Sequence, residues 1–237
     1  ILFNTMQEMY KHELKIKKHK KVSHFTYGRY GSTTTIELEN ILKELEQAYH
    51  VFLTGTGFGG IALALMALCR PGDEILVSDN VYGPTKEISQ ELMKEFKVDA
   101  KFYNPDSLDD LKRKISHKTK MILVENPGSN TFEFQDLSKV VKVAKRKKIF
   151  TLLDNTWGTP LYLKPLKLGF DMSFCSATKY FSGHSDAMGG SLAVNQKVFK
   201  KIMFFYKLSG YRMSADEAYL IIRGLRTLDT RLKQHYE

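Results

Sequence analysis

The fold of this chain is predicted by residues 121–154, which read MILVENPGSNTFEFQDLSKVVKVAKRKKIFTLLD. Two apolar runs, at 121–125 and 149–154, flank a segment with helical periodicity at 136–148. The run Met121-Ile122-Leu123-Val124 shows no alternation of apolar and polar residues, which is typical of a strand covered on both faces. Strands that alternate with helices predict a mostly parallel sheet between two helical layers, a three-layer α/β/α sandwich.

The same alternation extends in both directions from this stretch. Further strands are predicted at 50–53, 74–78, 101–103, 172–176 and 191–195, and further helices at 36–49, 61–69, 84–97 and 107–116, with a helical tail from 197 that breaks near 209–210. The first helix begins with a predicted capping box, Thr34-x-x-Glu37. The helix at 61–69 is apolar on all sides, so we expect it inside the domain. Residues 1–35 are predicted to form an N-terminal arm, outside a large domain at 36–237.

Composition limits the classes of protein to which this chain can belong. Its 237 residues are 43% hydrophobic and 12% aromatic, which excludes a disordered chain. The net charge of +10 raises nucleic acid as a partner, but 28 of the 36 basic residues are Lys, which favours solvated charged faces and no nucleic-acid partner. The longest apolar run, 58–69, is too short to cross a membrane. Cys69 and Cys175 are typical of buried thiols in a reducing compartment, so we expect a cytoplasmic protein.

Polar residues gather where the predicted strands end. Ligands of open α/β sheets bind at the carboxyl ends of the strands, where loops converge. The segments at these ends are Gly55-Thr56-Gly57, Asp79-Asn80-Val81-Tyr82, Glu125-Asn126-Pro127, Asp154-Asn155-Thr156 and Ser176-Ala177-Thr178-Lys179. We therefore expect the functional site among these segments.

The glycine pattern Gly55-x-Gly57-x-x-Gly60 admits two interpretations. It follows a strand and opens a helix, and Asp79 lies about 20 residues further on, as in a dinucleotide-binding fingerprint. In either interpretation the backbone can approach a phosphate, and the helix N-terminus directs N–H groups at it. Because a long segment precedes the supposed first strand and the later strand ends would have no role, an NAD-binding Rossmann oxidoreductase stays a distant alternative.

The segment Ser176-Ala177-Thr178-Lys179 indicates more specific chemistry. Two hydroxyls lie near a lysine, whose amine is a nucleophile when neutral, and the hydroxyls can donate to a phosphate beside it. Asp154 ends the apolar strand at 149–154, where a carboxylate is either a structural cap or a functional group. Pyridoxal phosphate requires such a set: a lysine for the Schiff base, a phosphate cradle, an acid at the pyridine nitrogen and an aromatic side chain on the ring.

Several motifs, ordered along nearly the whole chain, resemble one known family. They are Tyr27-Gly28-Arg29-Tyr30-Gly31, Asp79-Asn80-Val81-Tyr82, Asp154-Asn155-Thr156-Trp157, Ser176-Ala177-Thr178-Lys179-Tyr180, His184-Ser185-Asp186-Ala187-Met188 and Arg223-Gly224-Leu225-Arg226-Thr227-Leu228. The chain resembles the Cys/Met-metabolism family of fold-type-I pyridoxal-phosphate enzymes, whose large domain is aminotransferase-like. Within that family it is most similar to the cystathionine β-lyases.

The resemblance implies a role for each matching residue. Lys179 would bind the cofactor as an aldimine and move the α-proton of the substrate, and Asp154 would pair with the pyridinium. Tyr82 would stack on the cofactor ring and assist proton transfer. The implied phosphate ligands are Gly57, the Phe58 amide, Ser176 and Thr178, joined by Tyr27 and Arg29 from a neighbouring subunit. The resemblance therefore implies a site completed in a dimer, within a tetramer of two dimers, and no metal.

The resemblance also implies a reaction. Loss of the α-proton gives a carbanion delocalised into the cofactor ring, and a thiolate then leaves the β-carbon. From L-cystathionine the products would be homocysteine, pyruvate and ammonia, a step of methionine biosynthesis. Ser129 and the run 184–188 favour the β-lyases over the γ-lyases and γ-synthases of the family, which stay alternatives.

The chain also departs from the family pattern. Asn126 stands where Ser is usual, and Phe58 stands where a small residue is usual and can crowd the phosphate site. Family members continue with a smaller C-terminal domain, absent from this sequence, that supplies the arginine for the substrate carboxylate. This sequence is either part of a longer protein or a truncated gene product. If it is truncated, we expect cofactor binding at best, with very weak lyase activity, and a non-catalytic remnant of the fold is an alternative. His184 is expected to be a structural hydrogen-bond partner, and Trp157 to pack beneath the cofactor site.

Overall fold

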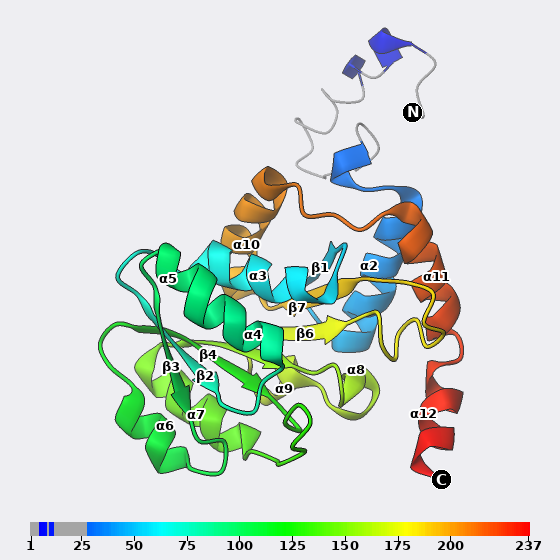
Figure 1. The fold of residues 1–237 in the computed structure, drawn as a ribbon. Coiled ribbons are helices and arrows are strands. Elements are labelled where there is room, and N and C mark those ends of the chain that lie inside the picture. The colour runs from blue at the N-terminus through cyan, green and yellow to red at the C-terminus, as the bar shows by residue number, and fades with distance from the viewer. Residues whose placement is uncertain (1–4, 9, 12–27) are drawn as a thin grey trace.

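The computed structural model describes residues 5–8, 10, 11 and 28–237, and its centre is a seven-stranded sheet (Figure 1). The strands, in the order β1-β7-β6-β5-β4-β2-β3 across the sheet, are β1 His50–Thr54, β2 Glu74–Ser78, β3 Asp99–Tyr103, β4 Thr119–Glu125, β5 Phe150–Asp154, β6 Met172–Ser176 and β7 Gly190–Val194. Within this sheet of described residues, β7 is the one strand whose direction is opposite to that of the other six. The prediction of a mostly parallel sheet is therefore confirmed.

Helices cover both faces of the sheet. Those on the first face are α3 Gly57–Leu68, α4 Gly83–Glu87, α5 Met93–Glu95 and α10 Gln196–Ser209. Those on the second face are α2 Thr33–Glu46, α6 Leu108–Lys114, α7 Leu137–Lys147 and α11 Ala215–Leu225. Successive strand residues such as Leu152 and Leu153 belong to the clusters on opposite faces, because side chains alternate along a strand. The predicted α/β/α sandwich is thus confirmed.

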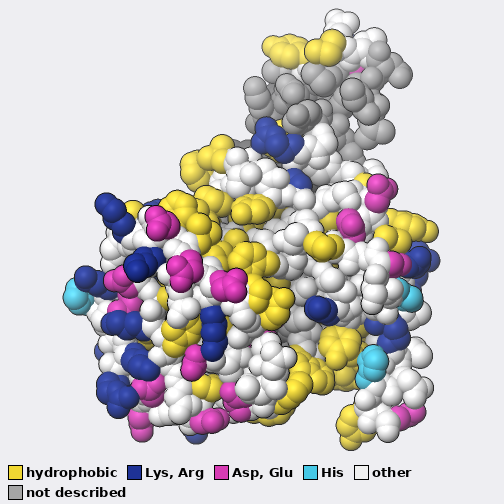
Figure 2. All heavy atoms as spheres, in the orientation of Figure 1, with side chains coloured by type: hydrophobic (Ala, Val, Ile, Leu, Met, Phe, Trp, Pro, Cys, Tyr) yellow, Lys and Arg dark blue, Asp and Glu magenta, His cyan; other side chains and the backbone are white. Residues whose placement is uncertain are grey.

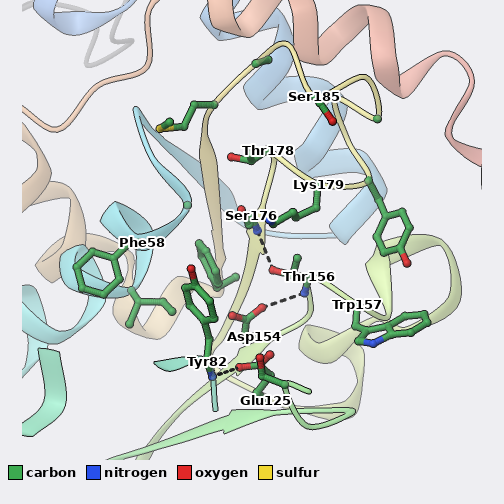
Figure 3. A pocket seen from close by; sticks show the side chains of 18 of the residues that line it. Phe58, Tyr82, Glu125, Asp154, Thr156, Trp157, Ser176, Thr178, Lys179 and Ser185 are labelled. Carbon is green, nitrogen blue, oxygen red and sulfur yellow. Dashed lines mark hydrogen bonds between the residues drawn. The ribbon is translucent and has the colours of Figure 1, made fainter. Parts of the chain in front are cut away.

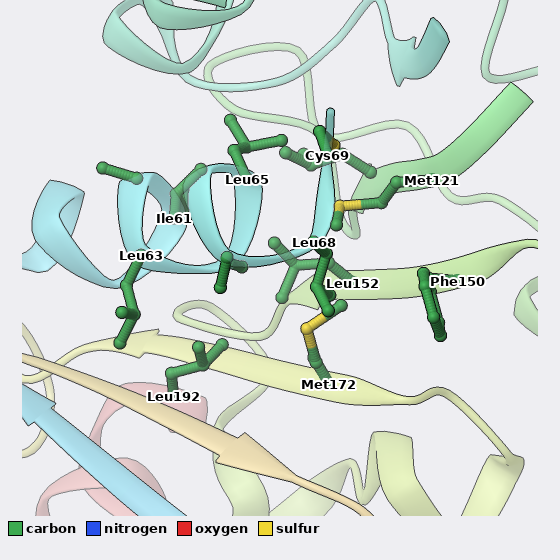
Figure 4. Close-up of a cluster of buried hydrophobic side chains, with 14 of the residues drawn as sticks. Ile61, Leu63, Leu65, Leu68, Cys69, Met121, Phe150, Leu152, Met172 and Leu192 are labelled. Atoms are coloured by element: carbon green, nitrogen blue, oxygen red, sulfur yellow. The ribbon is translucent and has the colours of Figure 1, made fainter. Parts of the chain in front are cut away.

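Helix α3 lies at the centre of the first cluster. Leu63, Leu65 and Leu68 are almost completely buried, and Figure 4 shows Leu68 beside Leu152 and Met172 of the sheet. A helix without a polar face is stable only when it is enclosed in this way. It begins at Gly57, earlier than predicted, because the Thr56 hydroxyl caps it by accepting a hydrogen bond from the Gly59 N–H.

The predicted capping box of α2 is wrong. Ser32 is the N-cap: its hydroxyl accepts the Thr35 N–H at 3.2 Å, and the Thr35 hydroxyl accepts the Ser32 N–H at 2.8 Å. The helix therefore begins at Thr33 and ends at Glu46, where Gln47 adopts a left-handed conformation with φ of 53°. The extended backbone of Ser32 selects the cap, and the spacing of residue types does not reveal it.

Other predicted helices are confirmed with changed limits. The single helix predicted at 84–97 consists of α4, a π-helical segment η2 Ile88–Leu92, and α5. The helical tail consists of α10, α11 and α12 Leu228–Tyr236, with Gly210 in the left-handed region after α10. Elements that the sequence pattern did not predict are the 3₁₀ turn η1 Gly28–Tyr30 and the short helices α8 Thr159–Tyr162 and α9 Pro165–Leu168.

The two cysteines, Cys69 and Cys175, are buried and carry free thiols. Among the described residues, no helix is both long and apolar enough to cross a membrane. On the face of the molecule shown in Figure 2, lysines and arginines are interspersed with acidic side chains and do not gather into one stripe.

Glu46, the last residue of α2, is a buried acid next to β6. Its Oε1 accepts hydrogen bonds from Ser173 Oγ at 3.2 Å and from Cys175 Sγ at 3.6 Å, while Oε2 has no partner among the described residues. Burial raises the pKa of Glu46 to about 7, against the opposing effects of these two bonds and of Lys164. The ionised form of this side chain is therefore disfavoured in the folded chain.

We predict that Glu46→Gln stabilises the chain above neutral pH. Because the folded pKa lies above the unfolded value of 4.5, the contribution of Glu46 to stability is complete below pH 4.5 and is lost as the pH rises through about 7. The free energy of unfolding of the variant should exceed that of the wild type by roughly 1–3 kcal/mol at pH 8 and by much less at pH 5. Urea denaturation measures both values, with the exposed Glu44→Gln as control. An equal gain at the two pH values would contradict the prediction.

Candidate functional site

The carboxyl ends of the central strands meet at a pocket of about 1070 Å³ (Figure 3). The predicted cofactor residues that line it are Gly57, Phe58, Tyr82, Asp154, Ser176, Thr178 and Lys179. The site expected from the strand ends is therefore present as one cavity. In the described part of the chain, no group of His, Cys, Asp and Glu side chains is arranged to hold a metal ion.

Of the two phosphate ligands predicted to come from a neighbouring subunit, the structure describes only Arg29, which does not line this pocket. Arg29 lies elsewhere, where its Nη1 donates to the Lys207 carbonyl at 2.9 Å and its own carbonyl accepts from Arg212 Nε at 2.5 Å. Tyr27 lies outside the described residues. Their contact with the cofactor of a neighbouring subunit stays a prediction.

The N-terminus of α3 forms one wall of the pocket through Gly57 and Phe58. A Cβ atom at Gly57 would lie 2.5 Å from Ser176 Oγ, so only glycine lets the helix approach the end of β6 this closely. The first N–H groups of a helix have no acceptor within it and attract anions. Figure 3 shows the Phe58 ring apart from Ser176 and Lys179, so the ring does not fill the space beside these two residues.

Lys179 follows β6 in a tight turn. Its N–H donates to the Ser176 carbonyl at 3.1 Å, and its own carbonyl accepts the Gly183 N–H at 2.8 Å. Figure 3 shows the side chain extending into the pocket toward Ser176. Among the described residues, the Lys179 amine has no hydrogen-bond or ion-pair partner, so it is available to a ligand of the pocket.

The hydroxyl groups of Thr178 and Ser176 have different surroundings. The Thr178 hydroxyl accepts the Gly189 N–H at 3.1 Å and donates to the Gly189 carbonyl at 3.3 Å, which joins the lysine turn to the start of β7. The Ser176 N–H donates to Thr156 Oγ1 at 2.8 Å, and the Ser176 hydroxyl lies against Gly57. The Ser176 hydroxyl is thus better placed than that of Thr178 to reach an anion at the α3 N-terminus.

Asp154 is a buried acid at the end of β5. Its Oδ1 accepts the Thr156 N–H at 3.0 Å, drawn as a dashed line in Figure 3. Burial raises the pKa of Asp154 to about 6, and hydrogen bonds from the Thr156 backbone and hydroxyl act in the opposite direction. A cationic group entering the pocket would stabilise the carboxylate, because Asp154 forms no ion pair with the described residues.

Glu125 is a site residue to which sequence reasoning assigned no role. It ends β4 directly opposite Asp154 in the strand register, and its Oε2 accepts the Tyr82 N–H at 2.7 Å. Burial and the neighbouring Asp154 raise the pKa of Glu125 to about 8. The available signal was its position among the polar strand ends, but the sequence does not state which strand lies beside which.

Aromatic side chains form the rim of the pocket. Tyr82 immediately precedes α4 and is 52% exposed. Trp157 is 47% exposed and contacts Phe132 and Tyr180 edge-on or tilted, at ring distances of 6.1 Å. The expectation that Trp157 packs beneath the site is therefore wrong, because its ring forms part of the wall. His184 Nδ1 lies 2.6 Å from the Ser182 carbonyl, in agreement with a structural role.

Helices α11 and α12 contribute further lining residues, which are Glu217, Arg231 and His235. No motif indicated them, because these helices reach the pocket only through their packing against the lysine turn. Gly224 of α11 is the closest contact: a Cβ there would lie 2.1 Å from the Ser182 carbonyl oxygen and 2.3 Å from that of Phe181. Glycine at 224 therefore sets how near α11 comes to the turn that carries Lys179.

The unusual Asn126 has a structural role. Its Oδ1 accepts the Gln135 N–H at 2.6 Å, and Gln135 Nε2 donates to Ser78 Oγ at 2.8 Å. The Tyr103 hydroxyl donates to Gln135 Oε1 at 2.9 Å. This buried network ties the loop after β4 to the end of β2 and so holds Glu125 in place.

Known proteins resemble this chain over most of its length. The sequence model described as Cys/Met metabolism PLP-dependent enzyme matches residues 4–237. Cystathionine β-lyase of Bordetella avium is 36% identical (89% of this chain, 53% of that protein), and L-alanine/L-glutamate racemase of Wolbachia pipientis is 35% identical (89% and 52%). The structure of cystathionine γ-synthase from Xanthomonas oryzae, in complex with aminoacrylate and cysteine, has a TM-score of 0.83 and 32% identity over 86% of this chain and 53% of its own. The chain spans about half the length of these relatives.

We predict that Gly224→Ala destabilises the chain by about 3 kcal/mol, because the new methyl group would overlap two backbone carbonyl oxygens that cannot move independently of the lysine turn. Urea denaturation checks this value. Gly83→Ala is the control, since nothing lies within 4 Å of its added methyl group. Equal stabilities of the two variants would show that α11 shifts freely.

We predict that Asp154→Asn stabilises the cofactor-free chain at pH 8. The folded pKa of Asp154 lies above the ordinary value of 3.8, so its stabilising contribution is complete below pH 3.8 and is lost as the pH rises through about 6. The gain in free energy of unfolding should be roughly 1–3 kcal/mol at pH 8 and close to zero at pH 4. Thermal denaturation of both proteins at the two pH values measures it. A variant that is less stable at pH 8 would contradict the assigned cause.

Proposed function

We propose a reaction for this chain, which belongs to the Cys/Met-metabolism family of pyridoxal-phosphate-dependent enzymes. The proposed activity is that of a carbon–sulfur lyase that cleaves L-cystathionine to homocysteine, pyruvate and ammonia. The cofactor of the family is pyridoxal phosphate. The observation that supports this proposal best is the shared cavity of the Lys179 amine, the buried Asp154 carboxyl and the glycine N-terminus of α3.

The residues of the pocket fit this cofactor. The close approach of Gly57 to Ser176 leaves backbone N–H groups and a hydroxyl for a phosphate, without a side chain between them. Lys179 offers a primary amine that has no partner among the described residues, and Asp154 offers an acid for a basic ring nitrogen. When bound, pyridoxal phosphate serves as an electron sink for the carbon that loses its proton.

The chain's own residues have separate tasks in this proposal. Lys179 binds the cofactor through Nζ and then moves a proton to or from the substrate Cα. Asp154 in its ionised form orients and holds the cofactor by a charged hydrogen bond. Tyr82, a half-exposed side chain, covers the cofactor ring from the side of α4, and its hydroxyl group can exchange a proton with the substrate.

Finer features of the proposal rest on the resemblance. We expect a homotetramer of two dimers in which Tyr27 and Arg29 reach the phosphate of the neighbouring subunit. The free, buried thiols are in keeping with the expected cytoplasmic location. Homocysteine as a product would place the reaction in methionine biosynthesis.

Two alternative reactions use the same pocket. Elimination at the γ-carbon of cystathionine gives cysteine, 2-oxobutyrate and ammonia, and the structural similarity to a γ-synthase keeps γ-chemistry as a candidate. Racemisation is a second candidate, because a racemase is 35% identical to this chain. It requires proton donors on opposite faces of the substrate, and Lys179 and Tyr82 both line the cavity. The products formed from cystathionine and from L-alanine distinguish the three reactions.

We predict that the wild-type chain turns yellow with pyridoxal phosphate and that borohydride reduction attaches the cofactor to Lys179. Lys179→Ala should lose the covalent label completely, because Lys179 is the one lysine among the described residues that line the pocket. Peptide mass spectrometry locates the label, and Lys167→Ala, an exposed lysine of α9, is the control.

Incubation of the wild-type chain with cystathionine should yield pyruvate at a low rate, measured with lactate dehydrogenase, because the expected arginine for the substrate carboxylate is not part of this sequence. Labelling at another lysine, or no binding of pyridoxal phosphate, would refute the cofactor assignment. Release of 2-oxobutyrate instead of pyruvate would refute β-elimination alone.

A further inference from the structure

Two acids face each other at the edge of the pocket. Glu125 ends β4 and Asp154 ends β5, and the two residues are direct partners in the register of the parallel strands. Figure 3 shows both side chains at the floor of the cavity, below Lys179. Because both are largely removed from water, ionisation of one opposes ionisation of the other.

Glu125 also fixes the position of Tyr82. The Tyr82 N–H donates to Glu125 Oε2 at 2.7 Å, a bond that spans 43 residues of sequence. The Tyr82 carbonyl accepts the N–H groups of Thr85 and Lys86, so both ends of this peptide segment are held as it enters α4. The ring position over the pocket therefore depends on where Glu125 lies.

Glu125 itself has little freedom. The Gln135 side chain donates to the Glu125 carbonyl at 3.4 Å, and Gln135 is joined to Asn126 on one side and to Ser78 on the other. The Ser129 hydroxyl lies at the Glu125 carboxyl. A main chain held in this way directs the side chain toward the Tyr82 amide.

The environments of the two acids differ. Asp154 receives hydrogen bonds from the backbone and the hydroxyl of Thr156, which favour its ionised form, and its pKa stays lower than that of Glu125. The other charged or titratable groups that line the pocket are Tyr82, Lys179, Tyr180, Asp186, Glu217, Arg231 and His235.

We propose that Glu125 is a positioning residue: as an uncharged acceptor it holds the Tyr82 backbone at the pocket, and it leaves Asp154 as the single negative charge of the pair. This inference rests on the proposed function for its meaning, since Tyr82 and Asp154 are the residues assigned to the cofactor ring. A neutral acid still accepts the Tyr82 N–H through its carbonyl oxygen. A second negative charge would compete with Asp154 for the proton of a bound ring nitrogen.

The first test needs no cofactor. Hydrogen exchange of the Tyr82 amide is measured by NMR at pH 7 in the wild type, Glu125→Gln, Glu125→Ala and the control Glu87→Ala, an exposed acid of α4. Glu125→Ala should lose protection roughly tenfold, as expected for one hydrogen bond. Glu125→Gln should keep it within about threefold. Amides of β1 report whether each variant is folded.

The second test uses pyridoxal phosphate. The visible circular dichroism of the bound cofactor, which reports the asymmetry around its ring, should change in Glu125→Ala, and the Kd should rise about tenfold, equivalent to one lost hydrogen bond. Glu125→Gln should retain the wild-type signal. Either of two results would overturn the proposal. If Glu125→Gln and Glu125→Ala both lose the wild-type signal, an ionised carboxylate is required. If both retain it, Glu125 has no effect on the cofactor.

The two tests separate the inference from the proposed function. If the wild-type chain binds no pyridoxal phosphate, the proposed function fails, while amide exchange still decides whether neutral Glu125 holds Tyr82. If the cofactor binds but Glu125→Ala leaves Tyr82 protection unchanged, the positioning role is refuted and the proposed function stands.

Discussion

Parallel strands that end together create the pocket. Glu125 of β4 pairs with Asp154 of β5, and Asp154 pairs with Phe174 of β6, so the turns that follow these strands meet at one edge of the sheet. The N-terminus of α3 points at the same edge, and it comes close only because Gly57 has no side chain to strike Ser176. An amine, an acid and an anion-binding helix terminus therefore share one cavity, although they lie far apart in the sequence.

Bringing two acids together in a buried pocket lowers the stability of the folded chain. Burial raises the pKa of Glu125 and Asp154, so the ionised forms that a cofactor site can use are disfavoured in the folded chain by itself. Functional sites commonly hold groups of this kind, and the surrounding core must offset them. Here the apolar α3 and the strands against which it packs supply that core. A ligand with a cationic ring nitrogen would stabilise the ionised form of Asp154, so that binding of the ligand would also stabilise the folded chain.

The order of strands and helices follows from local patterns, and the outcome shows where such patterns are informative. Strands 74–78 and 172–176 have the predicted limits, because apolar runs there end at polar residues. The cap of α2 was misplaced, since Ser32 and Thr35 depend on backbone conformation as much as on residue type. The π-helical segment 88–92 has no periodicity of its own by which to predict it.

The chemistry of the strand ends was readable in the same way: residue types next to a strand terminus place Lys179, Asp154 and the α3 glycines at one edge once the sheet is parallel. Three-dimensional packing settled the rest, because it depends on register and on contacts between distant segments. Packing places Glu125 beside Asp154 in the strand register and within hydrogen-bond distance of the Tyr82 amide. The same packing brings the Thr178 hydroxyl to the Gly189 backbone. It also brought α12 to the pocket, which no linear motif can express.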